Sequence, residues 1–273
     1  MNVQFFRIFL SVSNMKMKNL AIPLLFLPFA MFAQTNVPKE YVANKTSKPP
    51  RMDGRIRKSE WRNARWTDDF VDITGKPDLK PAQRTRCRML WDNEYLYIAA
   101  RMEETDLWAT LKERDAIIFH DNDFEIFIDP NNDTEQYYEI EVNAFSTVMD
   151  LFMNKAYRKG GTYDIHWNGG MNTAVKLKGT INNNRDRDKY WTLEMAIPFK
   201  GLERPGRISQ PTPGSKWRIN FSRVQWTMEP DSNGYRKKKK PDGRNLPEDN
   251  WVWSPIGVVN MHIPENWGIL TFR

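Results

Sequence analysis

In the stretch DFEIFID at residues 123–129, every second side chain is apolar, and of the residues between them only Phe127 is apolar too. Phe124, Ile126 and Ile128 fall on one face of an extended chain, and Glu125 falls on the opposite face. A period of two is the pattern of a β-strand with one face in a core. The Asx-rich residues 130–133 that follow indicate a turn. This stretch therefore predicts a strand with an apolar side and a polar side.

The same alternation recurs on both sides of this stretch. Apolar faces are found at residues 96–102, 138–144, 191–197 and 217–221, separated by turn signals. Long helical patterns are absent, and only Ser59–Ala64 and Phe199–Leu202 look helical. Many short strands with such spacing favour a sandwich. We expect an all-β protein built as an antiparallel β-sandwich with few short helices.

The first 33 residues have the pattern of a secretory signal peptide. A basic lead precedes the uncharged apolar run of residues 20–33, and polar sequence begins at Gln34. The run is shorter than the roughly 20 residues of a membrane span. A membrane-tethering helix is the alternative. We expect a secreted or periplasmic protein that does not span the membrane, with residues 34–50 as a lead-in segment and 51–273 as one domain.

Composition narrows the function classes. The 273 residues include 11 Trp, 15 Phe and 9 Tyr, which favours a packed core over disorder. Without the three basic residues of the predicted signal peptide, the net charge falls from +7 to +4, which argues against nucleic acid as a partner. Cys87 is the only cysteine, so disulfides and Cys-based zinc sites are excluded. We expect Cys87 to be a buried structural thiol.

Several short phrases occur in an ordered series along the chain. They are Met52-Asp53-Gly54, Glu60-Trp61 with Ala64, residues 90–97, 123–129, 142–144, 194–199, 217–223 and 253–255, and Trp267-Gly268. In this order they resemble the family 9-like carbohydrate-binding modules, and the resemblance covers residues 50–273. It implies a jelly-roll-like sandwich that binds xylan- or cellulose-derived chains and is often attached to glycoside hydrolases.

The resemblance also implies a site made of two aromatic rings and polar side chains. Glu125 and Asn143 match polar positions of that site, and Phe119 stands at one aromatic position. The second aromatic position falls near Met261, where His262 is a partial substitute. The two-ring arrangement is therefore not visible in the sequence.

Other polar and aromatic residues have two interpretations each. Arg86 and Arg88 lie together on the polar side of one predicted strand. With Glu125 and Asn143 they form either a platform for a sugar or a set of cross-strand ion pairs. Arg223 reaches the rim of the site or pairs with an acid. The remaining candidates lie in or near loops, where a ligand role competes with a core role: Trp167, Trp226 and Trp253.

The segment from Asp129 to Asp133 offers several oxygen ligands within five residues. Hard cations such as calcium prefer oxygen ligands, and some members of the resembled family carry structural calcium. The alternative is an Asx-rich hairpin turn. Apart from this calcium we expect no cofactor.

We interpret the chain as a non-catalytic module that binds a polysaccharide or oligosaccharide and works beside glycan-degrading enzymes. A ligand-free structural or adaptor module and a glycoside hydrolase are the alternatives. A haem-binding sandwich is disfavoured, because only His120, His166 and His262 are available and no Cys-x-x-Cys-His site exists. The glycan interpretation depends on Glu125 and Asn143 lying outward on adjoining strands.

Overall fold

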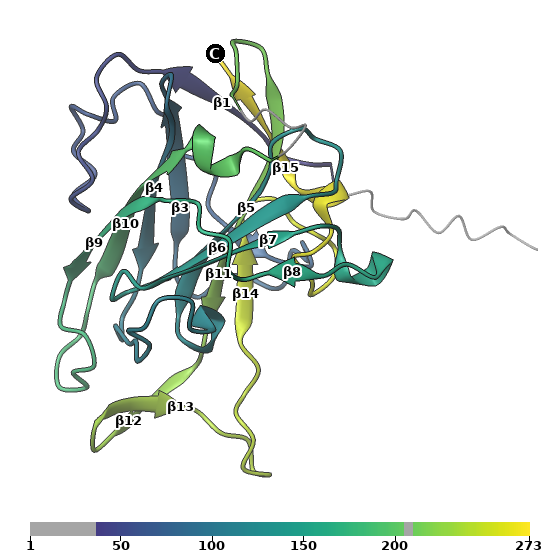
Figure 1. The fold of residues 1–273 in the computed structure, drawn as a ribbon. Helices are drawn as coiled ribbons and strands as arrows, with labels where there is room; N and C mark the ends of the chain where they lie inside the picture. Colours follow the sequence, from purple (N-terminus) through teal and green to yellow (C-terminus); the bar gives the residue numbers. More distant parts are fainter. Residues whose placement is uncertain (1–36, 205–209) are drawn as a thin grey trace, which may run out of the picture. The chain divides into compact units, whose positions relative to one another are not determined.

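Two β-sheets face each other across an apolar core, and one strand belongs to both of them (Figure 1). The computed structural model describes residues 37–204 and 210–273. The predicted signal peptide, residues 1–33, lies outside the described residues. Among the described residues no helix is long and apolar enough to cross a membrane.

The first sheet contains the DFEIFID stretch of residues 123–129 as strand β5. Its path, in spatial order, is β8 (Tyr163–Asp164), β7 (Val148–Met153), β6 (Tyr137–Asn143), β5 (Asp123–Asp129), β11 (Lys216–Gln225), β15 (Gly268–Phe272) and β1 (Glu40–Lys45). Two short strands branch from β11, namely β14 (Asp249–Val252) and, beside it, β2 (Val71–Asp72). A separate hairpin is formed by β12 (Met228–Asp231) and β13 (Gly234–Lys237).

The second sheet continues from the far end of β1. It consists of β3 (Thr85–Trp91), β4 (Tyr95–Glu103), β10 (Tyr190–Pro198) and β9 (Asn172–Lys178). Residues 40–43 of β1 pair with β15, while Asn44 and Lys45 pair with β3. Both pairings of β1 are parallel, and all other pairings are antiparallel. The β-sandwich is thus confirmed, and residues 40–45 of the expected lead-in segment form its strand β1.

The core between the sheets is built from the alternating faces of the strands. Phe124, Ile126 and Ile128 of β5 are fully buried there, and every apolar face expected from the sequence joins the same cluster. Cys87 is buried in this core, as expected for a structural thiol. Complete burial of each large apolar side chain contributes about 1.5–3 kcal/mol.

The outer face of the first sheet is also covered. A second apolar cluster joins Phe127 of β5 and Met149 of β7 to Ile73, Met261 and Trp267, which come from loops distant in the sequence. As a result, every residue of β5 and β6 is buried, on both faces. The polar side chains of these strands lie beneath loops and not on an open sheet.

In the two described ranges, helical structure is confined to four single turns of 3₁₀-helix: η1 (Ile118–His120), η2 (Tyr157–Lys159), η3 (Phe199–Leu202) and η4 (Pro264–Asn266). The helical turn expected at Phe199–Leu202 is confirmed. Residues 59–64 instead form hydrogen-bonded turns, in which Trp61 N–H donates to the carbonyl of Arg57 at 3.1 Å. The turns η1 and η2 carry residues of the site described next.

Candidate functional site

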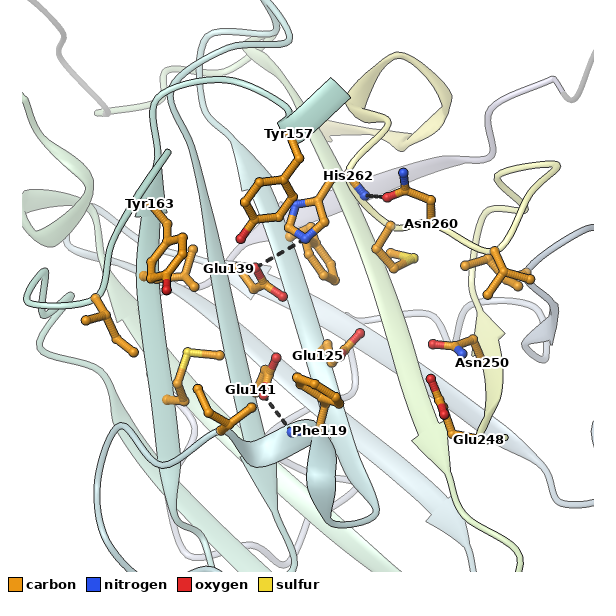
Figure 2. A pocket seen from close by; sticks show the side chains of 18 residues that line it. Phe119, Glu125, Glu139, Glu141, Tyr157, Tyr163, Glu248, Asn250, Asn260 and His262 are labelled. Atoms are coloured by element: carbon orange, nitrogen blue, oxygen red, sulfur yellow. Dashed lines mark hydrogen bonds and ion pairs between the residues drawn. The ribbon is translucent and has the colours of Figure 1, made fainter. Parts of the chain in front are cut away.

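A pocket of about 450 Å³ opens over β5, β6 and β7, under the loops that cover the outer face of the first sheet (Figure 2). Its volume lies within the range of roughly 300–1,000 Å³ typical of small-molecule sites. The lining contains carboxyl groups, aromatic rings and apolar side chains, and no lysine or arginine is among the described residues that line it. A charged, acidic ligand would therefore find no counter-ion here.

Three glutamates form the acidic wall of the pocket. Glu125 on β5 lies directly opposite Glu141 on β6, and Glu139 lies opposite Phe127, two pairs further along and on the same face. Direct cross-strand neighbours have Cβ atoms about 4.5–5.5 Å apart. Their exposed fractions are 5%, 2% and 6% for Glu125, Glu141 and Glu139. The prediction that Glu125 points away from the core is confirmed, but the prediction that it is open to water is wrong.

Burial and mutual repulsion favour the protonated forms of these acids. Desolvation raises the pKa of Glu125 to about 7. Desolvation and then the charge of Glu125 raise the pKa of Glu139 to about 8. Burial and the neighbouring acids also raise the pKa values of Glu141 and of Asp123, which lies behind the wall, well above the ordinary range. Near neutral pH the wall therefore retains protons, and its carboxyl groups both donate and accept hydrogen bonds.

His262 faces the acidic wall from the C-terminal loop. Its Nδ1 is hydrogen-bonded to the Tyr137 hydroxyl at 2.9 Å. Its Nε2 lies 3.8 Å from Oε2 of Glu139 (Figure 2). Desolvation lowers the pKa of His262 to about 4, so the imidazole is neutral near pH 7. The contact with Glu139 is thus a contact between polar groups and not an ion pair. The sequence suggested His262 as a residue of the site, and it lines this pocket.

Aromatic rings flank the carboxyl groups on two sides. Phe119 of η1 is 37% exposed and lies on one side of the glutamates, while the Tyr157 ring packs edge-on against His262 on the other, with centroids 4.5 Å apart (Figure 2). The Phe119 N–H donates to Oε2 of Glu141 at 2.8 Å, which fixes η1 against the wall. Tyr163, at 56% exposed, completes the rim. The sequence analysis found Phe119 but missed both tyrosines, whose only signal was their position around the Gly160-Gly161 turn.

Part of the acidic group also has the spacing of a cation site. Asp123, Glu125 and Glu141 each bring one carboxylate oxygen to within 4.8 Å of the others. Two calcium–oxygen bonds of 2.3–2.6 Å span such a distance. These are the residues that could hold a hard cation among those the structure describes.

Asn143 is not part of the pocket, and the prediction that it lies outward and open is wrong. It is fully buried at the end of β6. Its Nδ2 donates to the carbonyl of Leu111 at 2.7 Å and to Oδ2 of Asp121 at 2.9 Å, and its Oδ1 accepts the N–H groups of Phe145 and Thr147. Its amide is fully used in closing the turn after β6.

The three loop-proximal tryptophans do not line the pocket either. Trp167 packs on Tyr138 with centroids 4.5 Å apart, and Trp253 belongs to the core between the sheets. Trp226 lies close by, because its Nε1 donates to the carbonyl of Phe119 at 2.9 Å. These contacts match the core role, and not the ligand role, for the three tryptophans. Trp226 supports the loop that carries Phe119.

Both arginines lie away from the pocket. Arg223 is 1% exposed and forms an ion pair with Glu104 at 3.0 Å, which matches the ion-pair alternative. Arg88 lies on the outer face of the second sheet, where its guanidinium stacks 3.8 Å from the Trp66 ring centroid. The proposed platform of Arg88, Glu125 and Asn143 on one face is therefore wrong, because β3 and β5 belong to different sheets of the sandwich.

The carboxylate of Asp129 organises the turn after β5. Its Oδ1 accepts the N–H groups of Asn131 and Asn132, and its Oδ2 accepts the N–H of Thr134 at 2.7 Å. This is the pattern of an Asx-rich turn. Calcium at Asp129 and Asp133 stays a prediction.

Comparison with known proteins agrees with this architecture. A family model described as "Carbohydrate family 9 binding domain-like" matches residues 52–240. Among curated proteins, none matches the chain.

Solved structures share the fold at low sequence identity. A candidate carbohydrate-binding protein from Bacteroides uniformis is 17% identical with a TM-score of 0.61, and the match covers 87% of this chain and 100% of that chain. A carbohydrate-binding module of family 9 from Caldicellulosiruptor kristjanssonii, in complex with cellotriose, is 17% identical with a TM-score of 0.54 over 86% of this chain and 94% of that chain. The same module in complex with glucose also has a TM-score of 0.54, over 86% and 96% of the two chains.

Proposed function

Because the chain belongs to the carbohydrate family 9 binding domain-like family, we propose that it binds a neutral glycan, without cleaving it, in the pocket between Phe119 and His262. The observation that carries this proposal is the convergence of Phe119, Glu125 and His262 on one pocket. These three belong to the nine candidate ligand-binding residues that the sequence suggested, and the other six do not line the pocket. The three come from distant parts of the chain, so their meeting supports the inference.

The chemistry of the lining fits a sugar. The apolar C–H faces of a pyranose pack on aromatic rings, which Phe119 and Tyr157 supply. Sugar hydroxyls need fixed donors and acceptors, and protonated carboxyl groups of Glu125 and Glu139 offer both. The absence of a lining cation among the described residues argues against sugar acids as the pocket ligand.

For the identity of the glycan we propose plant-type chains such as glucan or xylan. Support comes from the related module that was solved with cellotriose and with glucose. We further propose that the chain is exported by its signal peptide and acts beside glycan-degrading enzymes in carbohydrate catabolism.

The test is calorimetric titration of cellotriose and xylotriose into the wild-type chain and its variants. Phe119→Ala and Tyr157→Ala should each weaken binding up to about ten-fold, because an aromatic contact contributes about 0.5–1.5 kcal/mol. Leu79→Ala, an equally exposed apolar residue outside the pocket, is the matched control. If no neutral glycan binds the wild-type chain, the ligand-free adaptor alternative replaces this proposal.

A glycoside hydrolase is the second candidate, and one observation favours it. Oxygens of Glu125 and Glu141 lie within 4.8 Å of each other, near the spacing of about 5–5.5 Å between the carboxyl groups of retaining enzymes. However, the two residues are direct partners on one face of one sheet, whereas hydrolysis requires carboxyl groups on opposite sides of the scissile bond. Steady turnover of a chromogenic glycoside that Glu125→Gln abolishes would establish the hydrolase.

A further inference from the structure

The outer face of the second sheet carries a row of basic side chains in direct cross-strand register. Arg86 on β3 lies opposite Arg101 on β4, Arg101 lies opposite Thr192 on β10, and Thr192 lies opposite Lys176 on β9. Like charges directly opposite each other destabilise a sheet. A stability argument alone therefore gives no reason for two arginines at paired positions.

These side chains line a hollow of about 430 Å³ that is separate from the glycan pocket. The hollow also receives Arg55 and Arg84, and its only acidic lining residue among those described is Glu103. Arg84 is paired with Asp69 at 2.7 Å. Within the described part of the chain, Arg86 and Arg101 form no ion pair with any acid. Their charges are left for a ligand.

Two aromatic rings hold these guanidinium groups in place. The Arg86 guanidinium carbon lies 4.5 Å from the Trp66 ring centroid, and that of Arg101 lies 3.5 Å from the Tyr190 ring centroid. Stacking fixes the plane of a guanidinium and leaves its N–H edge available for a bidentate contact with a carboxylate. Both rings line the same hollow.

Electrostatics point in the same direction. Desolvation, followed by the charges of Arg84 and Arg101, lowers the pKa of Arg86, while Asp69 and Glu103 oppose this change. Desolvation and repulsion thus destabilise the charged form of Arg86, and a bound anion would stabilise it. An extended nucleic-acid surface is a poorer match, because the sequence beyond residue 33 has a net charge of only +4.

We propose that this hollow is a second binding site, which takes the carboxylate groups of an acidic polysaccharide. The choice of a polysaccharide rests on the proposed glycan-binding function. The choice of a carboxylate rests on the paired, stacked arginines. The two outer faces of the sandwich would then accept different parts of a plant-type glycan, neutral units in the pocket and uronate units in the hollow.

Affinity electrophoresis in polygalacturonate gels tests the site. The wild-type chain should be retarded, and fully methyl-esterified polygalacturonate, which has the same backbone without charge, should not retard it. Arg86→Gln combined with Arg101→Gln should weaken binding at least ten-fold. Arg185→Gln combined with Arg244→Gln removes the same charge from exposed positions outside the hollow and should change binding less than two-fold.

Lys176→Gln, at an exposed position in the same row, is a second variant whose folding is not in question and should weaken binding several-fold. Equal retardation of the arginine variant and the control would overturn the proposal. So would equal binding of the methyl ester, tighter binding of dextran sulfate, or tighter binding of single-stranded DNA. Because cellotriose does not probe the hollow, its failure to bind would count against the pocket alone.

Discussion

The acidic wall of the pocket makes the stability of this protein depend on pH in an unusual direction. Glu139 has an ordinary pKa near 4.5 in the unfolded chain and a pKa of about 8 in the folded chain. Below pH 4.5 both states hold the proton. Between pH 4.5 and about 8 the folded state holds the Glu139 proton while the unfolded state releases it, so the contribution of Glu139 to stability falls as the pH rises. Above pH 8 the loss is complete.

The magnitude follows from the size of the change in pKa. A rise from 4.5 to about 8, at about 1.4 kcal/mol per pKa unit, corresponds to up to about 5 kcal/mol. That is a large part of the total stability of a typical domain, about 5–15 kcal/mol. Because the exposed fraction of Glu139 is only 6%, solvent screens its charge little. His262 acts in the opposite direction below about pH 6.5, because its pKa is about 4 in the folded chain and 6.5 in the unfolded chain, so only the unfolded state is protonated there. This contribution is common to the wild type and a Glu139 variant, so the comparison of the two isolates Glu139.

Glu139→Gln removes the ionisation while keeping the shape of the side chain. Urea unfolding, followed by tryptophan fluorescence between pH 5 and pH 9, should show the wild-type chain losing several kcal/mol more than this variant. Glu94→Gln, in an exposed turn, should lose as much as the wild type. Parallel stability curves for wild type and Glu139→Gln, or a wild-type chain that loses less stability than the variant as the pH rises, would refute the reasoning.

Three further predictions concern the framework around the site. Glu194→Ala should lower the free energy of unfolding by more than about 3 kcal/mol, because it leaves Trp61 Nε1–H and three backbone N–H groups without their acceptor; chemical denaturation measures this. Asp129→Ala should lower the free energy of unfolding by about 1–3 kcal/mol, because the Asp129 carboxylate accepts hydrogen bonds from three backbone N–H groups. Added calcium should raise the melting temperature of the wild type but not of this variant. Gly54→Ala should lower the melting temperature, because φ is +76° and a Cβ would lie 2.7 Å from the Lys176 nitrogen; an unchanged melting curve would contradict that close approach.

The sequence predicted the core well because the signal for it is local. Whether Ile126 or Ile140 faces the core is decided by alternation within seven residues, and both lie where the pattern places them. The same alternation correctly turned Glu125 away from the core. A period of two contains the direction of each side chain and requires no knowledge of its neighbours.

The exposure of the opposite face could not be predicted in this way. Glu125 is buried because Met261 and His262, more than 130 residues further along the chain, close over it. Asn143 is buried because the loop through Leu111 and Asp121 meets its amide. The parallel pairing of β1 with β15 likewise joins strands more than 220 residues apart. Nothing in a local pattern encodes such contacts.

The two outer faces show how coverage decides chemistry. Alternation places Glu125 on β5 and Arg86 on β3 at equivalent outward positions of the two sheets. Loops seal the first face, so desolvation drives its carboxyl groups toward the neutral form and suits them to uncharged hydroxyls. The second face stays open enough for Arg86 and Arg101 to keep their charge against flat rings, which suits them to anions. One strand pattern thus yields two faces of different chemistry, and the covering loops, which lie outside the pattern, determine which chemistry each face acquires.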